Sequence, residues 1–405
     1  MIRFLLIFWC TLTISGELLA QETVQWRGPE RSGKYPATGL LKSWPESGPA
    51  LLWHVDGLGK GHSSAVVTKD RIYLSGTLEE TGYIFCFSPD GKLLWKVPYG
   101  KEWTESWPGS RSTPLYVDGK LYMMSGFGNL FCMDAGTGKF IWNVDLFREY
   151  DGRSIKWGVT ENLLVDGDVL YCTPGGEKNN VIALDRNTGK LIWSCPGKGE
   201  VSAYCSPLLI KLPKRNVLVT QTANSILGID AKTGILLWSH PQPNKWSVHA
   251  NTPYYQDGYV YCVSGYGQGG VQLKIAADGS VKQEMWRNTL IDNRMGGFIV
   301  LDDRIYGSDD SNKGWFCVDW NTGKDITTEI MPGRGVVIYA DGMLYCYNDS
   351  GEFTLAKPAP AGLQKTSSFQ VPYGEDQHWA HPVITDGKLF IRHGSALMVY
   401  DIRQK

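Results

Sequence analysis

Histidine, arginine and aromatic side chains recur in this sequence a few residues before short apolar segments. Histidine can carry a proton near neutral pH, and arginine can bind a carboxylate or sulfate through two parallel hydrogen bonds. Aromatic side chains add flat faces on which a sugar ring can stack. We predict His249 and His381 as the catalytic acid or base. The residues predicted to bind substrate are His62, Trp107, Arg111, Trp157, Glu161, Tyr204, Asn251, Arg294, Arg334, His378 and Trp379.

These residue types fit one kind of chemistry when they act together. An arginine next to a uronate carboxylate would stabilise charge that develops at the neighbouring carbon while a histidine moves a proton. That is the logic of an acid/base lyase or a related sugar-modifying enzyme. The alternative is that polar side chains merely line a wet channel entrance, although cations crowded around one axis repel each other unless an anion compensates them. Whether the protein is an enzyme therefore stays open.

Loops near the same ends of the predicted strands carry weaker signals. Asp309 and Asp310 could hold a divalent cation, but two adjacent acids are also typical of a solvated turn. The glycine-rich segments 173–179 and 264–270 open no predicted helix, so they are weak evidence for phosphate binding. No pair of histidines has metal-ligand spacing and no nucleophile elbow occurs. We predict no metal site.

A repeating unit must position these candidates. Hairpin turns recur about every 39 to 48 residues, mostly as Asp-Gly between alternating apolar residues, which is a strong hairpin signal. The eight hairpins are VVTKDRIYL, LYVDGKLYM, LLVDGDVLY, LIKLPKRNVLV, YYQDGYVYC, IVLDDRIYG, VIYADGMLY and VITDGKLFI. Each hairpin leads into a third strand, a turn and a fourth strand. This pattern predicts an all-β fold, an eight-bladed β-propeller.

Both ends of the chain contribute to the last predicted blade. That unit supplies only three strands, whereas the segment ALLWHV, residues 50–55, precedes the first hairpin without a unit of its own. We expect this N-terminal strand to pair with the C-terminal blade and close the ring, which removes open sheet edges. The predicted organisation is a signal peptide at 1–20, an irregular arm at 21–49 lying against the propeller, and the propeller at 50–405.

A tryptophan occupies the same outer-strand position in most units, where a large ring can pack against the neighbouring blade. These scaffold residues are Trp53, Trp95, Trp142, Trp193, Trp238 and Trp286. Thr327 stands in that position in blade six, and blade seven lacks the turn motif. We expect these two blades to dock less tightly.

The repeats LDRNTGKLIW, IDAKTGILLW and MDAGTGKFIW resemble the tryptophan-docking motif of the quinoprotein family, the pyrroloquinoline quinone (PQQ)-like eight-bladed propellers. The resemblance covers about residues 50–401 and reports blade docking rather than activity. It implies a PQQ-dependent alcohol or sugar dehydrogenase, a scaffold similar to the assembly lipoprotein BamB, or an exported repeat protein of unassigned activity. The chain lacks the adjacent cysteine pair and the Cys-x-x-Cys-His haem motif of several dehydrogenases. We predict no cofactor, with PQQ and calcium as the alternative.

Six of the eight cysteines beyond the predicted signal peptide occupy repeated slots, which predicts small buried thiols. Cys195 and Cys205 fit no slot and could form a disulfide. The slot cysteines are Cys86, Cys132, Cys172, Cys262, Cys317 and Cys346.

Composition limits the partners and the location. With 40 basic and 41 acidic residues, the formal net charge of -1 favours neither nucleic acid nor anionic membranes. The first 20 residues have the layout of a secretory signal peptide, and no later segment is apolar enough to span a membrane. We expect an exported, soluble monomer in the periplasm or outside the cell.

Three functions follow as hypotheses. The leading hypothesis is a central funnel that binds a polar small molecule or oligosaccharide, most plausibly an acidic carbohydrate, with chemical turnover left open. The second is a BamB-like envelope scaffold with a protein partner, and the third is a PQQ-dependent dehydrogenase.

Overall fold

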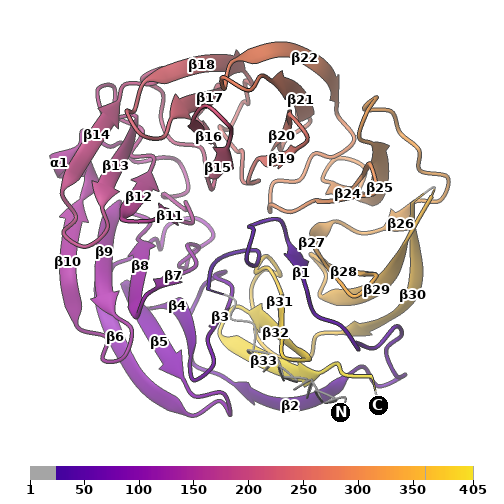
Figure 1. The fold of residues 1–405 in the computed structure, drawn as a ribbon. Helices are drawn as coiled ribbons and strands as arrows, with labels where there is room; N and C mark the ends of the chain where they lie inside the picture. The colour runs from indigo at the N-terminus through magenta and orange to yellow at the C-terminus, as the bar shows by residue number, and fades with distance from the viewer. Residues whose placement is uncertain (1–23, 361, 405) are drawn as a thin grey trace, which may run out of the picture.

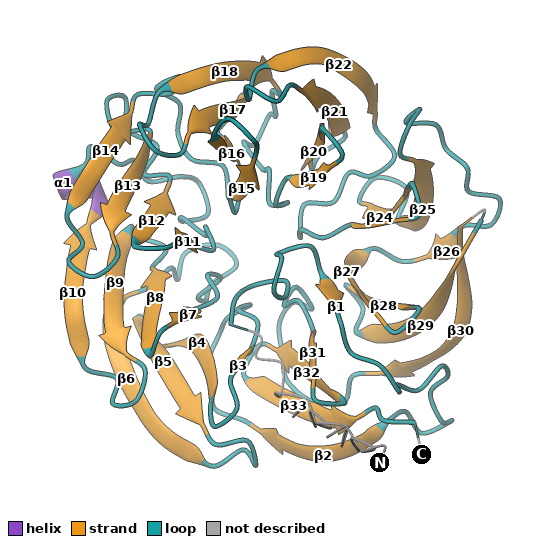
Figure 2. Ribbon diagram, in the orientation of Figure 1, coloured by secondary structure: helices purple, strands orange, loops and turns teal. Residues whose placement is uncertain are grey.

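The computed structural model describes residues 24–360 and 362–404, which form eight β-sheets around a central axis (Figure 1). In each sheet the strands follow one another from the central axis to the outside of the ring, and loops or turns connect them (Figure 2). The eight-bladed propeller predicted from the repeats is confirmed. The predicted signal peptide, residues 1–20, lies outside the described residues.

Blades one to four follow the chain in order, each with its first strand innermost. Blade one consists of β3 (Val66–Val67), β4 (Ile72–Leu78), β5 (Thr81–Phe87) and β6 (Leu93–Lys101). Blade two consists of β7 (Leu115–Val117), β8 (Lys120–Met124), β9 (Asn129–Asp134) and β10 (Phe140–Asp145), followed by the single-turn helix α1 (Leu146–Glu149). Blade three consists of β11 (Leu164–Asp166), β12 (Val169–Cys172), β13 (Val181–Asp185) and β14 (Leu191–Cys195). Blade four consists of β15 (Leu208–Lys211), β16 (Asn216–Gln221), β17 (Ser225–Asp230) and β18 (Leu236–Pro241).

Blades five and six again consist of consecutive strands, whereas blades seven and eight also take strands from the N-terminal part of the chain. Blade five consists of β19 (Tyr254–Gln256), β20 (Tyr259–Ser264), β21 (Gly269–Ile275) and β22 (Val281–Asn288). Blade six consists of β23 (Ile299–Leu301), β24 (Arg304–Asp309), β25 (Gly314–Asp319) and β26 (Met331–Pro332). Blade seven consists of β27 (Gly335–Ala340), β28 (Met343–Asn348), β29 (Glu352–Ala359) and β30 (Gly362–Gln370), with β1 (Lys34–Tyr35) added inside. Blade eight consists of β31 (Val383–Thr385), β32 (Lys388–His393), β33 (Ala396–Asp401) and β2 (Ala50–Val55).

Blade eight closes the ring as predicted. Strand β2 pairs antiparallel with β33, with Trp53 opposite Val399, so the outermost strand of the last blade comes from the start of the propeller. Separating the blades at this point would break a strand pairing as well as apolar packing.

Each outer-strand tryptophan contacts the following blade through its ring and its indole N–H. Trp193 donates to the carbonyl oxygen of Ala231 at 3.0 Å, and its ring covers Gly234. A Cβ on Gly234 would lie 2.7 Å from that ring, and the residue has φ +74°, so glycine is required on both counts. The equivalent indole bonds run from Trp53 to Pro89, Trp95 to Gly136, Trp142 to Arg186, Trp238 to Gly279 and Trp286 to Trp320.

Blades six and seven lack this motif, and the N-terminal arm supplies packing on blade seven. In blade six, the hydroxyl of Thr327 instead accepts from the Cys317 amide at 2.8 Å. On blade seven, Trp44 of the arm packs against Tyr345 and Phe369, each with a ring-centroid distance of 5.8 Å. The arm is therefore part of the hydrophobic core at this side of the ring.

The arm also enters the central channel. Strand β1 pairs in parallel with β27 and lies on the axis side of it, at the inner edge of blade seven (Figure 1). Arg27 donates to the Phe298 carbonyl at 2.7 Å, and Arg31 donates to the carbonyls of Asn162 and Leu163, each at 2.7 Å. These contacts connect the arm to blade six and to the segment that enters blade three.

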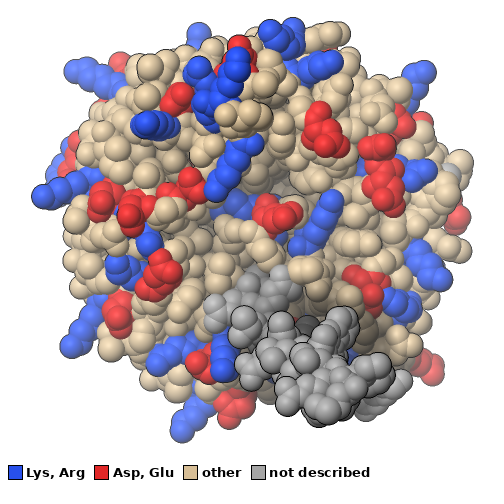
Figure 3. Space-filling model, viewed as in Figure 1, with Lys and Arg blue, Asp and Glu red and all other residues tan. Residues whose placement is uncertain are grey.

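The cysteines are buried, as their repeated slots predict, and the surface charges are mixed, as the net charge near zero predicts. All eight cysteines of the described chain are buried and free, so Cys195 and Cys205 form no disulfide in this structure. Basic and acidic side chains are interspersed over the face shown in Figure 3. Within residues 24–360 and 362–404, no helix has the length and hydrophobicity needed to cross a membrane.

Trp193→Ala should lower the free energy of unfolding by about 3–5 kcal/mol, because it empties a large buried site between two blades. Trp193→Phe should cost less, roughly 1–2 kcal/mol, since it keeps an aromatic ring but loses the indole hydrogen bond and part of the buried volume. Urea denaturation followed by circular dichroism measures both. Trp107→Ala is the control, because Trp107 is 50% exposed. Equal losses for the two alanine variants would contradict the scaffold role.

Candidate functional site

A cavity of about 260 Å³ lies where the segments that enter the innermost strands converge. Eight residues predicted as site residues line it, and they come from blades far apart in the sequence. They are His62, Trp107, Arg111, Trp157, Tyr204, Arg294, Trp379 and His381. The repeat architecture therefore brings together side chains that are separated by up to several hundred residues.

Two groups of aromatic rings contribute to the lining of this cavity. In one group, the ring centroids of Trp107 and Trp379 lie 5.5 Å apart. In the other, the ring of Trp157 lies 6.1 Å from that of Tyr204, and Trp246 packs on Trp157 from outside the lining at 6.1 Å. A flat ligand with apolar faces could contact both groups.

Arg111 lies in the cavity wall between these aromatic groups. Its guanidinium donates to the backbone carbonyl oxygens of Ser106, Trp107 and Trp157. Within the described chain, no carboxylate oxygen lies within ion-pair distance of it. Burial lowers the pKa of Arg111 to about 10, so the side chain stays charged at neutral pH. An anionic ligand would compensate this charge.

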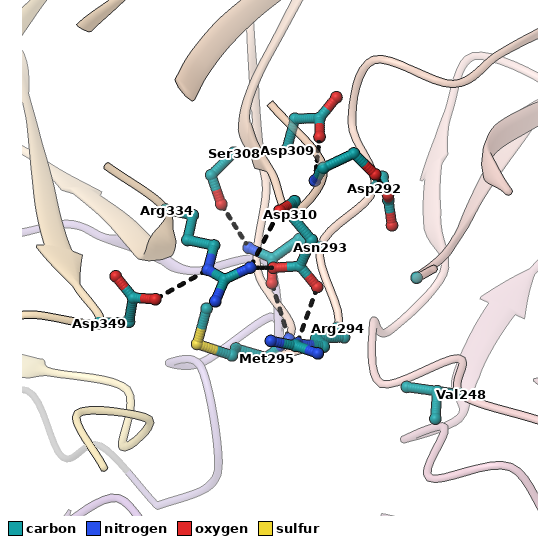
Figure 4. Close-up of polar contacts among 12 residues, drawn as sticks. Val248, Asp292, Asn293, Arg294, Met295, Ser308, Asp309, Asp310, Arg334 and Asp349 are labelled. Carbon is teal, nitrogen blue, oxygen red and sulfur yellow. Dashed lines mark hydrogen bonds and ion pairs between the residues drawn. The ribbon is translucent and has the colours of Figure 1, made fainter. Parts of the chain in front are cut away.

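Arg294 and Arg334, predicted to bind the same anion, are instead neutralised by acids of the protein. The Nε atom of Arg294 lies 3.0 Å from an Asp310 carboxylate oxygen, and Arg334 pairs with Asp349 at 2.7 Å and with Asp310 at 3.8 Å (Figure 4). Arg294 still lines the cavity, whereas Arg334 does not. The prediction that both arginines bind a ligand anion stays a prediction, and each of them already has an acid of the protein as a partner.

Asp309 and Asp310 form a turn and an ion-pair network rather than a cation site. Asp309 accepts from the backbone N–H groups of Ser311 and Asn312, as in an ordinary acidic turn. The carboxylate of Asp310 faces arginines. In the part of the chain that the structure describes, no group of three or more His, Cys, Asp or Glu could hold a metal ion.

Neither predicted catalytic histidine presents a free nitrogen to the cavity. His249 is fully buried outside the cavity lining, and its Nε2 contacts the Ala223 carbonyl at 3.2 Å. Burial lowers the pKa of His249 to about 4. His381 lines the cavity, but its Nδ1 accepts from Arg27 at 3.1 Å and its Nε2 contacts the Met295 carbonyl at 3.2 Å. Burial, followed by the charge of Arg27, holds the pKa of His381 well below its usual value.

Three more predicted residues lie outside the cavity lining, because their side chains bind neighbouring backbone or rings. Glu161 accepts from the Thr173 amide at 2.8 Å. Asn251 donates to one backbone carbonyl and accepts from one backbone amide. The ring of His378 contacts the hydroxyl of Tyr347. A position just before an innermost strand does not decide which way the side chain turns.

Several cavity residues were not predicted. Trp26 reaches the cavity from the arm and meets His381 edge-on, with a ring-centroid distance of 4.9 Å. Tyr266 comes from a loop between the second and third strands of blade five, a segment in which only the glycines had been noted. The others are Thr160, Asn162, Val248, Ala250 and Met295. Their position in entering segments was the signal that could have identified these five.

A buried carboxyl positions the loop that carries Tyr266. Asp292 accepts from the Gly267 amide at 2.7 Å and from the Ser311 hydroxyl at 3.1 Å. Burial raises the pKa of Asp292 to about 7. Tyr266 has φ +58° and contacts Arg294, whose guanidinium carbon lies 5.4 Å from the ring centroid. Asp292 thus helps to hold this loop, together with hydrogen bonds from the Gly265 amide to the Val248 carbonyl and from the Asn244 amide group to the Gly265 carbonyl.

Comparison with protein families adds an independent observation. A family model described as "Outer membrane protein assembly factor BamB" matches residues 80–329, well over half of the chain. The chain belongs to this family of PQQ-like propellers. This match confirms the resemblance to PQQ-like propellers that the tryptophan motifs indicate.

Curated relatives of this PQQ-like propeller include both dehydrogenases and assembly factors. The quinoprotein alcohol dehydrogenase PedH of Pseudomonas putida is 26% identical over 120 residues, 29% of this chain and 19% of PedH. BamB of Kangiella koreensis is 29% identical over 143 residues, 34% of this chain and 33% of that protein. The matches therefore span a third or less of the length of these relatives.

Solved structures agree on the fold. BamB from Moraxella catarrhalis superposes with a TM-score of 0.64 at 14% identity, covering 88% of this chain and 98% of that chain. A europium-containing methanol dehydrogenase superposes with a TM-score of 0.65 at 11% identity, covering 93% of this chain and 90% of that chain. At these identities the likeness shows the propeller alone.

The cavity lining of this PQQ-like propeller does not supply the ligands of the calcium ion that accompanies PQQ. Calcium takes six to eight oxygen ligands, among which carboxylates are prominent. The cavity lining contains two arginines and two histidines but no aspartate or glutamate. The donor set therefore suits an anion rather than a divalent cation.

Glu161→Gln should flatten the dependence of stability on pH. Burial raises the pKa of Glu161 to about 8 from its usual 4.5, so between these values the unfolded chain ionises while the folded chain stays protonated. Wild-type stability should then fall as pH rises through this window, by up to about 1.4 kcal/mol per pH unit. Glutamine stays neutral and retains an acceptor for the Thr173 amide.

Urea denaturation at pH 4, 6 and 8 measures the effect. The Glu161→Gln variant should exceed the wild type in stability at pH 8 and match it at pH 4. Glu105→Gln is a control at an exposed glutamate. A variant that is less stable at pH 8 would show that Glu161 is ionised in the folded protein.

Proposed function

We propose that the central cavity binds a small acidic carbohydrate and that the protein is exported to the periplasm or the medium. The observation that carries this proposal is Arg111, a half-buried cation whose hydrogen bonds all go to backbone carbonyls among the described residues. It lines the cavity together with the aromatic rings. The signal-peptide layout of the first 20 residues supports export.

The need for a negative charge follows from the environment of Arg111. A guanidinium that is partly withdrawn from water, as that of Arg111 is, favours an opposite charge or well-placed acceptors nearby. The carbonyl groups satisfy hydrogen bonds but supply no formal charge. A carboxylate or sulfate on the ligand would supply that charge.

The size and the walls of the cavity favour a sugar ring as the rest of the ligand. Its volume of about 260 Å³ lies just below the roughly 300–1,000 Å³ of pockets that hold drug-sized molecules. A pyranose ring has two faces rich in C–H groups, which can contact Trp107 on one side and Trp157 on the other. An acidic sugar thus uses the charge and the aromatic rings together.

Binding rather than turnover is the function that these contacts support. His249 lies outside the cavity lining, and both nitrogens of His381 already have partners. Burial raises the pKa of Tyr204 to about 12, which keeps its hydroxyl protonated at neutral pH. The two histidines predicted as acid and base are therefore poorly placed for proton transfer to a ligand.

A thermal-shift screen of the purified protein tests the proposal. The panel contains uronic, sulfated and neutral oligosaccharides, together with PQQ plus calcium. A ligand at 100 times its Kd adds about 2.7 kcal/mol to stability, enough to raise the Tm by a degree or more. Uronic oligosaccharides should raise the Tm, and Arg111→Gln should abolish the shift.

Arg304→Gln is the matched control, because Arg304 lies in β24 outside the cavity. Equal shifts with neutral sugars would contradict the acidic-ligand proposal. A shift with PQQ and calcium alone would favour a quinone-dependent activity instead.

A BamB-like scaffold is the second candidate function. It is supported by the family match and by the fold of Moraxella BamB, of which this chain covers 98%. In that case a protein partner would bind exposed loops and would not need the cavity.

Affinity purification under mild detergent distinguishes the two functions. A scaffold should bring down an envelope protein in a fixed ratio, and Arg111→Gln should leave that ratio unchanged. Elution of the protein alone, as a monomer, would count against the scaffold.

A further inference from the structure

The positive charges at the two ends of the cavity are compensated to different extents. At the blade-six end, Arg294 lies 3.0 Å from a carboxylate oxygen of Asp310. At the other end, Arg111 and Arg392 have no carboxylate oxygen within 4.0 Å among the described residues. The positive charge without a carboxylate at ion-pair distance is therefore concentrated where blades eight, one and two meet, and the buried Glu102 acts on Arg111 only from a longer distance.

Arg392 lies behind the cavity wall at this end. It is 2% exposed, and it donates to the Ser63 hydroxyl at 2.6 Å and to the Gly394 carbonyl at 3.0 Å. Its Nη2 atom has no hydrogen-bond partner within the described chain. That atom approaches Gly61 so closely that a Cβ there would lie 2.5 Å away. The segment carrying His62 thus packs directly on a buried cation.

His62 is the histidine that this environment leaves unpartnered. It lines the cavity, is 8% exposed, and its ring centroid lies 5.0 Å from that of Trp379. Neither ring nitrogen has a hydrogen-bond partner among residues 24–360 and 362–404. The other histidines each have a polar partner: His54, His240, His249, His378, His381 and His393.

An unpartnered buried imidazole is costly, because both ring nitrogens lose their hydrogen bonds to water. Such a group is explained when a ligand completes its hydrogen bonds. The ring lies in the cavity wall that Arg111 shares, so one ligand group could reach both side chains.

We propose that His62 and Arg111 form the subsite for the anionic group of the ligand, with Arg392 behind them, and that His62 takes up a proton from solvent when the anion binds. This inference rests on the proposed function and adds the orientation of the ligand: its charge faces His62, and its ring extends toward Arg294. No covalent bond forms or breaks.

The charges around His62 explain the proton uptake. Burial lowers the pKa of His62 well below its usual value, and Arg111, Arg392 and His393 lower it further. The ring is therefore neutral in the free protein. A carboxylate bound between His62 and Arg111 would oppose these positive charges and favour the imidazolium. Binding and protonation of His62 are then linked.

Titration calorimetry with trigalacturonate at pH 6, in two buffers of different ionisation enthalpy, measures affinity and proton uptake together. The wild type should take up protons on binding. His62→Gln should bind at least about tenfold more weakly, since it loses a charged hydrogen bond, and should take up none. Arg304→Gln, at an arginine of β24 outside the cavity lining, is the matched control and should retain the uptake. Binding of neutral galactotriose should be unaffected by His62→Gln.

The outcomes separate this inference from the function on which it rests. If the wild type binds trigalacturonate but His62→Gln has the same affinity and proton uptake, the subsite is overturned and the proposed function stands. If the wild type does not bind trigalacturonate, the proposed function fails. The Tm of His62→Phe then shows whether the His62 ring has a structural role. A Tm at or above that of the wild type supports the inference that His62 makes no stabilising hydrogen bond in the free protein and is available to a ligand. A lower Tm shows a structural ring and overturns the inference.

Discussion

The packing of each outer tryptophan against the next blade is the interaction on which the rest of the structure depends. A four-stranded sheet cannot bury both of its faces alone, so every blade needs a neighbour on each side. The indole fills that interface, and its N–H binds the turn of the next blade, as Trp193 does with Ala231. Because β2 completes blade eight, the series has no free end. The rigid ring then holds eight entering segments around one axis.

The same ring leaves a channel, and the N-terminal arm determines what remains of it. Arg27 and Arg31 bind backbone carbonyls of separate blades, and Trp26 contributes to the cavity wall. Arg27 also occupies a nitrogen of His381, which removes that histidine from acid/base chemistry. The arm therefore shapes the site as well as filling the channel, and it favours binding over proton transfer at this position.

The fold was predictable from the sequence because it depends on repetition. The hairpin period indicates eight blades, the recurring tryptophan indicates how they dock, and the extra strand at residues 50–55 fits only the incomplete last blade. The position of eight candidate residues around the cavity followed from the same repeat. Side-chain direction did not, because His249 and His381 both precede an innermost strand and only one of them faces the cavity. The ion pairs could not be predicted from the sequence either, since Asp310 meets Arg294 and Arg334 only after blades six and seven assemble. Trp26 was missed because nothing in the arm repeats.

A crystal structure of the protein with bound trigalacturonate tests the central claim most directly, because the claim concerns where an acidic sugar lies. The account predicts a carboxylate of the ligand within hydrogen-bond distance of Arg111, with a sugar ring between Trp107 and Trp157. A ligand bound outside the cavity, or with its carboxylates directed to solvent and away from Arg111, would contradict it.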